Sequence, residues 1–441
     1  MRALQKKFYI ETFGCQMNVF DSERIIYIME KEGYVRTSDP ECSEIILINT
    51  CSVREKAENK LFGHIGNLKS LKIKKPGLLI CIGGCTAQNK SAEIINKFPY
   101  VDIVFGTANI NKLPDLISER LLKNRSVCDT GDFPETFDYL YDFKRQYSFK
   151  ALLPIMIGCN NYCSYCIVPF VRGRERSAGF DQIIKTAEKL AGEGVVEITL
   201  LGQNVNSYGQ DLKTGHENFA KLLSEISQIK ALKRIRFMTS HPGDFNEDII
   251  DVISENNNIM NHVHLPLQAG SDRILKKMNR HYTSADFKKI YYMIKEKIPD
   301  CAVTTDIIVG FPEEKEEDFL KTLKLVKELR FNRAFTFIYS TRKGTSAELL
   351  EDSVSADTKR LWFRNLLELQ NKISLEENMK LVGKKLKVLV EGYSLKNNQL
   401  EGRLENNLIV NFRGDEEMIG KFIKLKITDA KSFYLKGKIS E

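Results

Sequence analysis

Short apolar runs separated by amphipathic stretches fill the first third of the chain. The apolar runs predict β-strands at Phe8–Phe13, Ile45–Asn49, Leu78–Ile82 and Val101–Phe105. The stretches between them predict helices, among them Asp21–Glu32 and Arg54–Leu71. Because strands that alternate with helices form parallel sheets, we expect an N-terminal α/β domain over residues 1–130.

The same alternation resumes at residue 149, after a polar and aromatic segment, residues 131–148, that we interpret as a linker. Six runs predict strands, at Leu152–Ile157, Val196–Leu201, Arg234–Thr239, His262–Pro266, Ala302–Val309 and Ala334–Tyr339. Helices such as Gln182–Ala191 and Glu316–Leu329 would cover the outside. Six such units predict a partial (βα)6 barrel over residues 149–378, with active-site residues at the C-terminal ends of its strands.

The pattern changes again in residues 379–441, which follow a predicted helix at Asp357–Met379. Three runs there, KKLKVLVEGY, LEGRLENNLIVNF and GKFIKLKITDA, alternate apolar and polar residues and are separated by turn signals. This pattern is typical of a small antiparallel β-barrel. From Lys380 to Glu441 there are 13 Lys and Arg against 8 Asp and Glu, a net charge of +5. The expected fold class is therefore α/β, followed by a small, positively charged, OB-like barrel.

Composition indicates the class of protein and its cellular compartment more than its function. The 441 residues are 42% hydrophobic and 28% charged, which is ordinary for a globular protein, and the net charge of +8 permits a polyanionic partner such as RNA without demanding one. No apolar run approaches the ~20 residues of a membrane helix, and no signal-peptide core follows the N-terminus. We therefore expect a cytoplasmic protein without membrane attachment, in which cysteines that cluster bind metal.

Three of the ten cysteines form a Cys-x3-Cys-x2-Cys motif, made of Cys159, Cys163 and Cys166, just after the first predicted barrel strand. Three thiolates on one short loop can bind three irons of a [4Fe–4S] cube and leave the fourth iron open. That open iron can be chelated by the amino and carboxylate groups of S-adenosylmethionine. The alternative is a zinc site, which would need a fourth ligand nearby.

Cys15, Cys51 and Cys85 form a second possible group, because each follows the C-terminal end of a predicted strand. In a parallel sheet those ends share one edge, so three cysteines distant in sequence can meet there. Glycines precede two of them and would let the backbone approach a bulky cofactor. The alternative is three unrelated buried cysteines. The remaining four, Cys42, Cys81, Cys128 and Cys301, show no pattern of partners.

The chain resembles the radical S-adenosylmethionine methylthiotransferase family over essentially its whole length. The matching segments are Thr12–Glu23, Asn49–Glu58, Gly84–Gln88, Gly158–Gly173, Leu201–Tyr208, Thr239–Pro242, His264–Ser271 and Met278–Thr283. Gln16-Met17-Asn18 and the run from Ser52 to Lys56 favour the bacterial members that act on N6-dimethylallyladenosine in tRNA. They disfavour the members that act on a ribosomal-protein aspartate or on threonylcarbamoyl-adenosine. The C-terminal segment resembles the RNA-binding TRAM domain of that family.

The resemblance implies insertion of a methylthio group at C2 of N6-dimethylallyladenosine at tRNA position 37, next to the anticodon. It implies two [4Fe–4S] clusters, one on each cysteine triad, and two uses of S-adenosylmethionine, as methyl donor and as source of a 5′-deoxyadenosyl radical. It also implies a tRNA substrate and a low-potential electron donor resembling flavodoxin or ferredoxin, and we expect a monomer. An unactivated aromatic C–H bond needs such radical chemistry, for which the protein supplies binding and orientation.

Five further residues are candidates for contacts to S-adenosylmethionine. Gln203 and Asn204 end the second predicted barrel strand, Ser240 ends the third, Gln268 ends the fourth, and Arg174 follows the cysteine loop with Arg172 and Arg176. For the amides and the hydroxyl, the alternative role is to satisfy the local backbone. For the arginines, it is a solvated basic turn, and contact with tRNA phosphates also remains open.

The chain departs from the family pattern at two places. Glu313 and Lys315 replace a glycine and a threonine of a Gly-Phe-Pro-Gly-Glu-Thr sequence, and Ala178 replaces an arginine. We expect these changes to affect loops or substrate contacts and not the clusters. Three competing functions remain: modification of another substrate by the same chemistry, a non-catalytic RNA-binding iron–sulfur protein, and a zinc scaffold.

Overall fold

The computed structural model describes residues 6–52, 55–131, 133–137, 143–212, 217–394 and 399–440, without the side chains of residues 55–59. Parts of the sequence predictions fall outside these residues. They include residues 1–5 of the expected N-terminal domain, Val53 and Arg54 in the run from Ser52 to Lys56, residue 132 and residues 138–142 of the expected linker, and Glu441 at the end of the chain.

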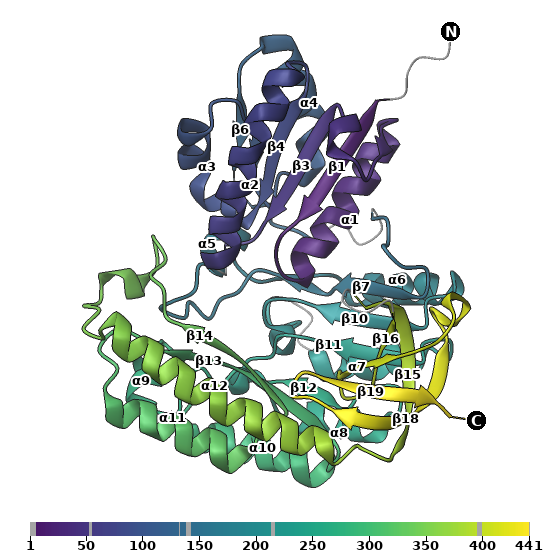
Figure 1. Ribbon diagram of the computed structural model, residues 1–441, viewed down its shortest axis with the longest axis vertical. Helices are drawn as coiled ribbons and strands as arrows, with labels where there is room; N and C mark the ends of the chain where they lie inside the picture. The colour runs from purple at the N-terminus through teal and green to yellow at the C-terminus, as the bar shows by residue number, and fades with distance from the viewer. Residues whose placement is uncertain are drawn as a thin grey trace.

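Six parallel strands form the N-terminal sheet, in the order β2-β1-β3-β4-β5-β6 (Figure 1). The strands are β1 Lys7–Thr12, β2 Val35–Arg36, β3 Ile45–Thr50, β4 Leu79–Gly84, β5 Ile103–Phe105 and β6 Val127–Asp129. The expected parallel α/β arrangement is confirmed. The sequence pattern does not predict β2 and β6, because strands of two and three residues leave almost no periodic signal.

Helices cover both faces of this sheet. α1 (Gln16–Lys31) and α4 (Leu113–Lys123) pack on one face, and α2 (Glu55–Lys74) and α3 (Cys85–Lys97) pack on the other. Burial on both faces explains why β3 reads as a continuous apolar run instead of an alternating one. The sequence prediction started α1 five residues too late, because the first turn of this helix alternates polar and apolar residues and buries the polar Asn18, so it does not look amphipathic.

Six parallel strands also form the curved wall of the central part. β7 (Lys150–Pro154), β10 (Glu197–Leu201) and β11 (Arg234–Phe237) make one sheet, and β12 (His262–His264), β13 (Ala302–Val309) and β14 (Arg333–Ile338) make the other. Ile235 joins them, because its N–H donates to Asn258 O (2.7 Å) and its carbonyl accepts from Met260 N (3.0 Å). The wall is a partial barrel.

The expected strand Leu152–Ile157 is wrong in one detail, since it is two strands. β7 ends at Pro154, and β8 (Met156–Ile157) turns away to pair antiparallel with β9 (Arg176–Ser177). The break falls at Pro154, a residue that cannot donate a backbone hydrogen bond to a neighbouring strand. The turn directs the chain into the loop that carries the Cys-x3-Cys-x2-Cys motif.

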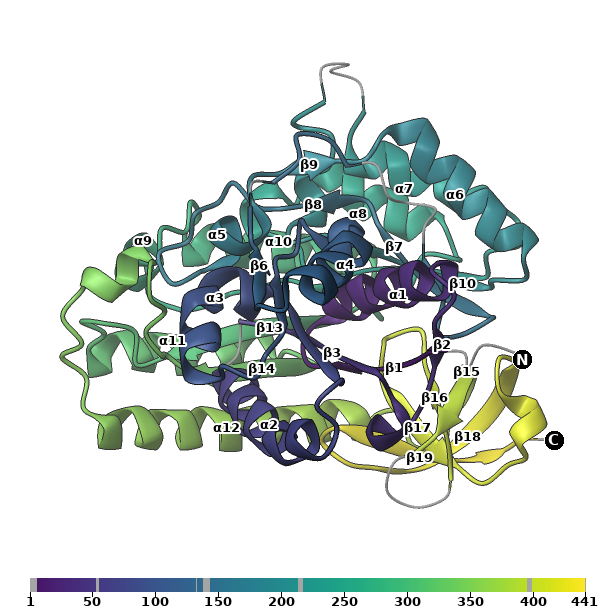
Figure 2. The same ribbon diagram turned by 90° about the horizontal axis from the view of Figure 1, so that it is seen from above.

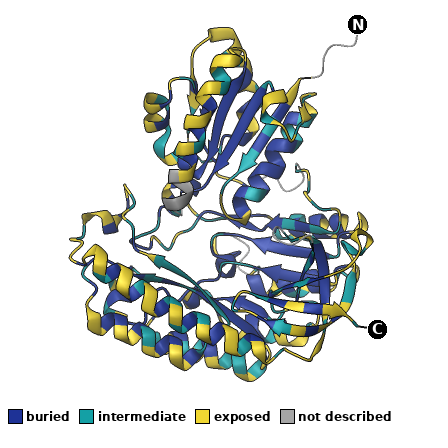
Figure 3. Ribbon diagram, viewed as in Figure 1, coloured by how far each residue is buried: buried dark blue, intermediate teal, exposed yellow. Residues whose placement is uncertain are grey.

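Helices cover the outer side of this wall and bury its apolar residues, as Figure 3 shows. They are α6 Phe180–Gly192, α7 Phe219–Ser227, α8 Glu247–Glu255, α9 Asp272–Lys277, α10 Ser284–Lys297, α11 Glu316–Leu329 and α12 Ala356–Met379. The short helix α5 (Val168–Arg172) lies instead on the side of the N-terminal sheet, where it packs against α3. No described helix is long and apolar enough to cross a membrane.

A closed five-stranded barrel follows α12, in the order β15-β16-β17-β19-β18. Its strands are β15 Lys385–Tyr393, β16 Leu400–Arg403, β17 Ile409–Phe412, β18 Phe422–Ala430 and β19 Tyr434–Ile439. The expected barrel is confirmed, but its pairing is not wholly antiparallel, because β17 and β19 are parallel. Seen from above, the barrel lies to one side of the N-terminal sheet, which covers the central strands (Figure 2).

Two buried arginines fix this barrel to the central wall. Arg234 donates to Arg403 O (2.6 Å) and Lys387 O (3.0 Å). Arg236 donates to Leu404 O (2.7 Å) and Glu405 O (3.1 Å), and its Nε lies 3.1 Å from the buried carboxylate of Glu197. The contact therefore joins charged side chains of β11 to main-chain oxygens of the barrel.

We predict that Arg236→Met destabilises the chain by about 3 kcal/mol, because it leaves the Glu197 carboxylate buried with one distant partner, Arg234, at 3.8 Å. Denaturant unfolding followed by the fluorescence of Trp362, the single tryptophan, measures the change. Lys233→Met, at the exposed neighbouring position, is the control and should shift stability by no more than about 0.5 kcal/mol. Equal stabilities of the two variants would contradict the prediction.

Candidate functional site

The carboxyl ends of the N-terminal strands bring three cysteines to one edge of the sheet. Cys15 follows β1 and immediately precedes α1, Cys51 follows β3 directly, and Cys85 follows β4 as the first residue of α3. The chain places β2 on one side of β1 and then returns to place β3 on the other side. The direction in which strands are added to the sheet therefore reverses between β1 and β3. Open α/β sheets bind ligands at such a reversal, outside the carboxyl ends of the strands.

The sulfurs of this triad interact with one another and with one arginine. The Cys51 thiol hydrogen-bonds to Cys15 and is the main reason that the pKa of Cys15 falls to about 6. Burial raises the pKa of Cys85, which also hydrogen-bonds to the guanidinium of Arg172. Although burial opposes its charge, the Asp21 carboxylate and the sulfurs of Cys85 and Cys15 hold the pKa of Arg172 well above its usual value.

Two glycines allow this close approach. A Cβ at Gly14 would lie 2.7 Å from Cys51 Cβ, and a Cβ at Gly84 would lie 2.4 Å from the carbonyl oxygen of Thr50. Gly84 also has φ +92°, which disfavours residues with a side chain. Both positions therefore require glycine for the strand ends to meet.

A buried amide network, which the sequence prediction missed, holds the strand ends together. Asn18 on α1 donates to Thr50 O (2.9 Å), and Asn49 on β3 donates to Asn18 O (2.8 Å) and to Ser22 Oγ (2.9 Å). Asn18 also accepts from the Cys15 thiol at 3.3 Å. The only sequence signal for these asparagines is that both fall in segments that carry the family resemblance.

The second triad lies on the loop after β8. Cys163 is buried, and Cys159 and Cys166 are partly exposed. Burial, with a smaller contribution from the neighbouring Cys163 sulfur, raises the pKa of Cys159 to about 11 and that of Cys166 to about 12. The Asn161 amide lies 3.5 Å from Cys159 Sγ. Because the Cys163 sulfur acts on the pKa of both Cys159 and Cys166, the three sulfurs are close enough to bind a cofactor together.

Arg280 supplies positive charge to this triad, and the sequence prediction did not identify it. Its Nη1 donates to Cys163 Sγ (3.4 Å), its Nη2 to Pro266 O (3.1 Å) and its Nε to Tyr282 Oη (3.0 Å). This contact places a buried positive charge beside the Cys163 sulfur. Arg280 and Tyr282 lie in the segment Met278–Thr283, one of those that resemble the family. This resemblance is the sequence signal that could have identified them.

One short segment separates the two triads. Cys85 packs against Ile167 and Val171 in a small buried cluster, and Ile167 directly follows Cys166. Thr107, after β5, donates to Val171 O at 2.6 Å, and Arg172 at the end of α5 pairs with Asp21 on α1 at 2.6 Å. Helix α5 therefore joins the N-terminal sheet to the loop that carries the second triad.

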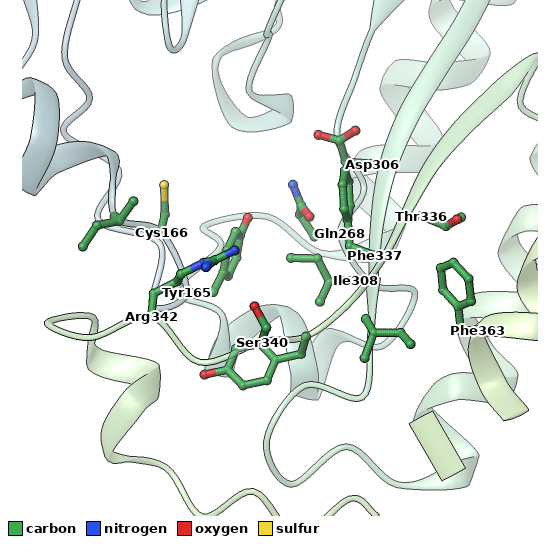
Figure 4. Close-up of a pocket in the computed structure, with 13 residues that line it drawn as sticks. Tyr165, Cys166, Gln268, Asp306, Ile308, Thr336, Phe337, Ser340, Arg342 and Phe363 are labelled. Carbon is green, nitrogen blue, oxygen red and sulfur yellow. The ribbon is translucent and has the colours of Figure 1, made fainter. Parts of the chain in front are cut away.

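A cavity of about 610 Å³ opens beside Cys166 (Figure 4). Cys166 and Tyr165 line one side, and Gln268 and Asp306 line the other, with the side chains of Cys166, Gln268 and Asp306 turned the same way in the figure. Most of its floor is apolar and comes from β13, β14 and α12. A largely apolar cavity with a few polar groups suits a nucleoside-sized ligand.

The structure does not bring all five predicted contact residues to this cavity. Gln268 lines it, with φ +66° and a buried Oε1 that finds no hydrogen-bond partner among the described residues. Gln203 accepts from Gly158 N at 2.5 Å and so supports the cysteine loop. Asn204 instead lines a separate polar cavity of about 300 Å³ and donates to Asp244 at 2.6 Å.

The other two predicted contacts are Ser240 and Arg174. The buried Ser240 hydroxyl has no hydrogen-bond partner among the described residues, and Arg174 is exposed. The arginines on either side of Arg174 are engaged within the protein: Arg172 pairs with Asp21, and Arg176 donates to the carbonyls of Pro134 and Arg172. Of this group, Arg174 alone remains exposed for an outside ligand.

The departures from the family pattern lie outside the cysteine loop and the strand ends that carry the triads. Glu313 has φ +63°, where glycine is the usual residue, and pairs with Lys277 at 2.6 Å. Lys315 precedes α11, and the buried Ala178 accepts from Tyr208 Oη at 2.9 Å through its carbonyl. Glu313 and Lys315 thus lie in a loop before α11 and Ala178 lies in the core, and the expected effect on substrate contacts stays a prediction.

The residues present fit iron–sulfur cubes. Each triad offers three sulfur donors beside a buried arginine, and the glycines at positions 14 and 84 let the strand ends that carry the first triad approach one another. Among the described residues no three His, Cys, Asp or Glu side chains converge to hold a single ion. A cube differs from a single ion because each thiolate binds its own iron.

Three family models match successive parts of the chain. Residues 7–106 match "Uncharacterized protein family UPF0004", residues 153–326 match the radical SAM superfamily, and residues 379–440 match the TRAM domain. The first contains Cys15, Cys51 and Cys85, and the second contains Cys159, Cys163 and Cys166. The third coincides with the closed barrel.

Curated relatives match nearly the full length. A tRNA-2-methylthio-N(6)-dimethylallyladenosine synthase of Clostridium botulinum is 48% identical over 98% of this chain and 96% of its own. A protein of the same name from Thermoanaerobacter pseudethanolicus is 47% identical over 98% and 93%. Among solved structures, the radical S-adenosylmethionine methyltransferase TsrM of Kitasatospora setae aligns with TM-score 0.56 at 14% identity, over 75% of this chain and 72% of its own. That likeness shows a shared fold.

The lowered pKa of Cys15 predicts selective alkylation of the cluster-free protein. At pH 7 Cys15 is mostly thiolate, and its reaction with iodoacetamide should slow as pH falls through about 6. Cys42 is the control, because it is also exposed but the hydrogen bond to Asp39 raises its pKa. Peptide mass spectrometry measures both rates, and Cys51→Ala should move the Cys15 midpoint upward. Identical pH profiles for Cys15 and Cys42 would exclude the Cys15–Cys51 contact.

Proposed function

The chain belongs to the family of tRNA-2-methylthio-N(6)-dimethylallyladenosine synthases, and from that membership we propose that it methylthiolates N6-dimethylallyladenosine in tRNA. The reaction replaces the C2 hydrogen of the base at position 37, next to the anticodon, with S–CH3. The identity of 48% along nearly both full chains supports the same reaction, since it includes all three parts of the fold.

The observation that carries the proposal is the pair of cysteine triads separated by one helix. We propose one [4Fe–4S] cluster on Cys159, Cys163 and Cys166, and a second on Cys15, Cys51 and Cys85. When bound, these clusters supply the electron and the sulfur site for the reaction, with one S-adenosylmethionine as methyl donor and another as radical source. A single triad would provide for only one of these two roles.

The chain's own residues position and shield this chemistry. Arg172 places its positive charge beside the Cys85 sulfur and Arg280 places its charge beside the Cys163 sulfur, and Gln203 holds Gly158 at the base of the cysteine loop. We assign the cavity beside Cys166 to the nucleoside of S-adenosylmethionine, with Gln268 on its wall. Its apolar floor excludes water, which protects a reactive radical from side reactions.

Three more residues are proposed as contacts to S-adenosylmethionine. Ser240 has an unused buried hydroxyl, Arg174 offers an exposed guanidinium, and Asn204 has a buried carbonyl oxygen without a partner among the described residues. A guanidinium can pair with the carboxylate of S-adenosylmethionine, and the hydroxyl and amide can bind its polar groups. For the contact with Asn204, one molecule of S-adenosylmethionine must extend from the cavity lined by Gln268 into the polar cavity lined by Asn204.

The C-terminal barrel is proposed to hold the tRNA. Lys384, Lys385, Lys387, Arg403, Arg413, Lys424 and Lys426 contribute to its net charge of +5. Contacts of these side chains to phosphates would make affinity fall steeply with salt. The target adenine must leave its stack to reach a recessed site, as bases in RNA loops can. We further propose that the chain acts as a monomer and receives electrons from a low-potential flavodoxin-like or ferredoxin-like donor.

The test is mass spectrometry of tRNA nucleosides from a strain that lacks the gene. Methylthio-N6-dimethylallyladenosine should disappear and N6-dimethylallyladenosine should accumulate, and the intact gene should reverse both changes. Neither Cys15→Ala nor Cys163→Ala should restore the product. Cys42→Ser and Cys128→Ser, at exposed cysteines outside both triads, should restore it. Unchanged methylthio-adenosine in the deletion strain would reject the function.

Iron analysis separates two clusters from one. The anaerobically reconstituted chain should hold about eight irons, and Cys51→Ala or Cys163→Ala should each lower that to about four. Absorbance near 400 nm and iron assay measure the content. Four irons in the unaltered chain would reject the second cluster while leaving the radical chemistry possible.

A further inference from the structure

Two aromatic side chains are exposed beside the Cys159 triad. Tyr162, between Cys159 and Cys163, is 44% exposed, and Phe170 on α5 is 51% exposed. Their rings meet edge to face, with centroids 6.5 Å apart. Paired aromatic rings at a surface are typical of binding sites, because they offer rigid apolar area.

The backbone holds Tyr162 in an unfavourable conformation. Its φ is +45°, in the left-handed region that residues with a side chain avoid. The Asn279 amide stabilises this conformation, since it donates to Asn161 O (3.2 Å) and Tyr162 O (3.0 Å). Left-handed residues outside glycine cluster at functional positions, where neighbouring contacts maintain them.

Positive charge lies on one side of this ring, whereas on the other side Asn160 bonds to Glu175 and lines the polar cavity that also contains Asp211 and Asp244. The cysteine loop, residues 160–164, bonds to residues 276–281 through Ser164 N and Met278 O (3.0 Å), and to residues 340–347 through Ala347 N and Ser164 O (2.8 Å). These three segments contain no Asp or Glu. They carry the exposed Lys276 and Lys343, together with Lys277, which pairs with Glu313. This charge would attract an acidic partner.

The aromatic pair does not line the cavity assigned to S-adenosylmethionine. Tyr165 and Cys166 face that cavity (Figure 4), whereas neither Tyr162 nor Phe170 lines it. The cysteine loop thus presents separate residues to the cavity and to solvent. A protein that delivers electrons needs access to the loop without entering the cavity, and Tyr162 directly precedes the ligand candidate Cys163.

We propose that Tyr162, Phe170 and Lys276 form the docking surface for an acidic flavodoxin that reduces the cluster on Cys159, Cys163 and Cys166; this rests on the proposed function. One electron leaves the flavin and one enters the cluster, and no atom is transferred. The aromatic pair packs against the exposed apolar edge of the flavin ring. RNA is the weaker occupant, because over half of the chain's net charge lies in the C-terminal segment instead.

The test measures binding of oxidised flavodoxin to the full-length chain by calorimetry, before cluster reconstitution. Tyr162→Asn, which tolerates the left-handed backbone, and Phe170→Ser should each raise Kd by about tenfold. Lys276→Glu should do the same and make binding less sensitive to salt. Tyr292→Ala and Lys372→Glu are matched controls at exposed aromatic and lysine positions, and should leave Kd unchanged.

A second measurement uses the reconstituted enzyme. Stopped-flow absorbance should show cluster reduction by flavodoxin hydroquinone slowed about tenfold in Tyr162→Asn, with reduction by dithionite and methylthiolation driven by dithionite unchanged. If Tyr162→Asn lost the dithionite-driven activity, or bound tRNA more weakly while its affinity for flavodoxin was unchanged, the docking surface would be overturned. The two rings would then belong to the substrate site. Absence of product in the unaltered enzyme would instead reject the proposed function.

Discussion

The buried ion pair between Arg172 and Asp21 is the contact on which the arrangement of the site depends. Arg172 ends the helix that follows the Cys159 triad, and Asp21 lies on the helix that follows Cys15. A guanidinium removed from water is costly unless it is fully paired, so its partners must stay in place. Here the partners are a carboxylate and the sulfurs of Cys85 and Cys15. The same charge thus joins two parts of the chain and neutralises thiolates.

That pairing explains why the two triads are neighbours although more than 70 residues separate Cys85 from Cys159. The first triad comes from the strand ends of one sheet, and the second from a loop on another. Helix α5 is short, and its apolar face covers Cys85 while its last residue reaches Asp21. Parallel strand ends supply the cysteines, and this helix sets their separation.

The sequence predicts features that depend on local pattern. The strands before Cys15, Cys51 and Cys85 are visible as apolar runs because helices cover both faces of the sheet, and helix α11 matches its expected bounds. Contacts between distant polar residues are not visible in the same way. Asn18 with Asn49, Arg172 with Asp21 and Arg280 with Cys163 each join segments far apart in sequence. Nothing in the periodicity of either segment identifies its partner. The parallel β17–β19 pair was missed because alternation indicates a strand but not its direction.

The arginines of β11 hydrogen-bond to the C-terminal barrel through its main-chain oxygens, and the guanidinium of Arg234 also lies over the Phe422 ring of β18, 4.9 Å from its centroid. Carbonyl groups are the same at every residue, so this attachment imposes little on which amino acids the barrel carries at those positions. Barrel surface side chains other than Phe422 and Glu391, which pairs with Lys150 at 3.2 Å, are then able to diverge without loosening the barrel's hold on the rest of the molecule. The barrel is held mainly by its backbone, so most of its surface is free to evolve toward different partners.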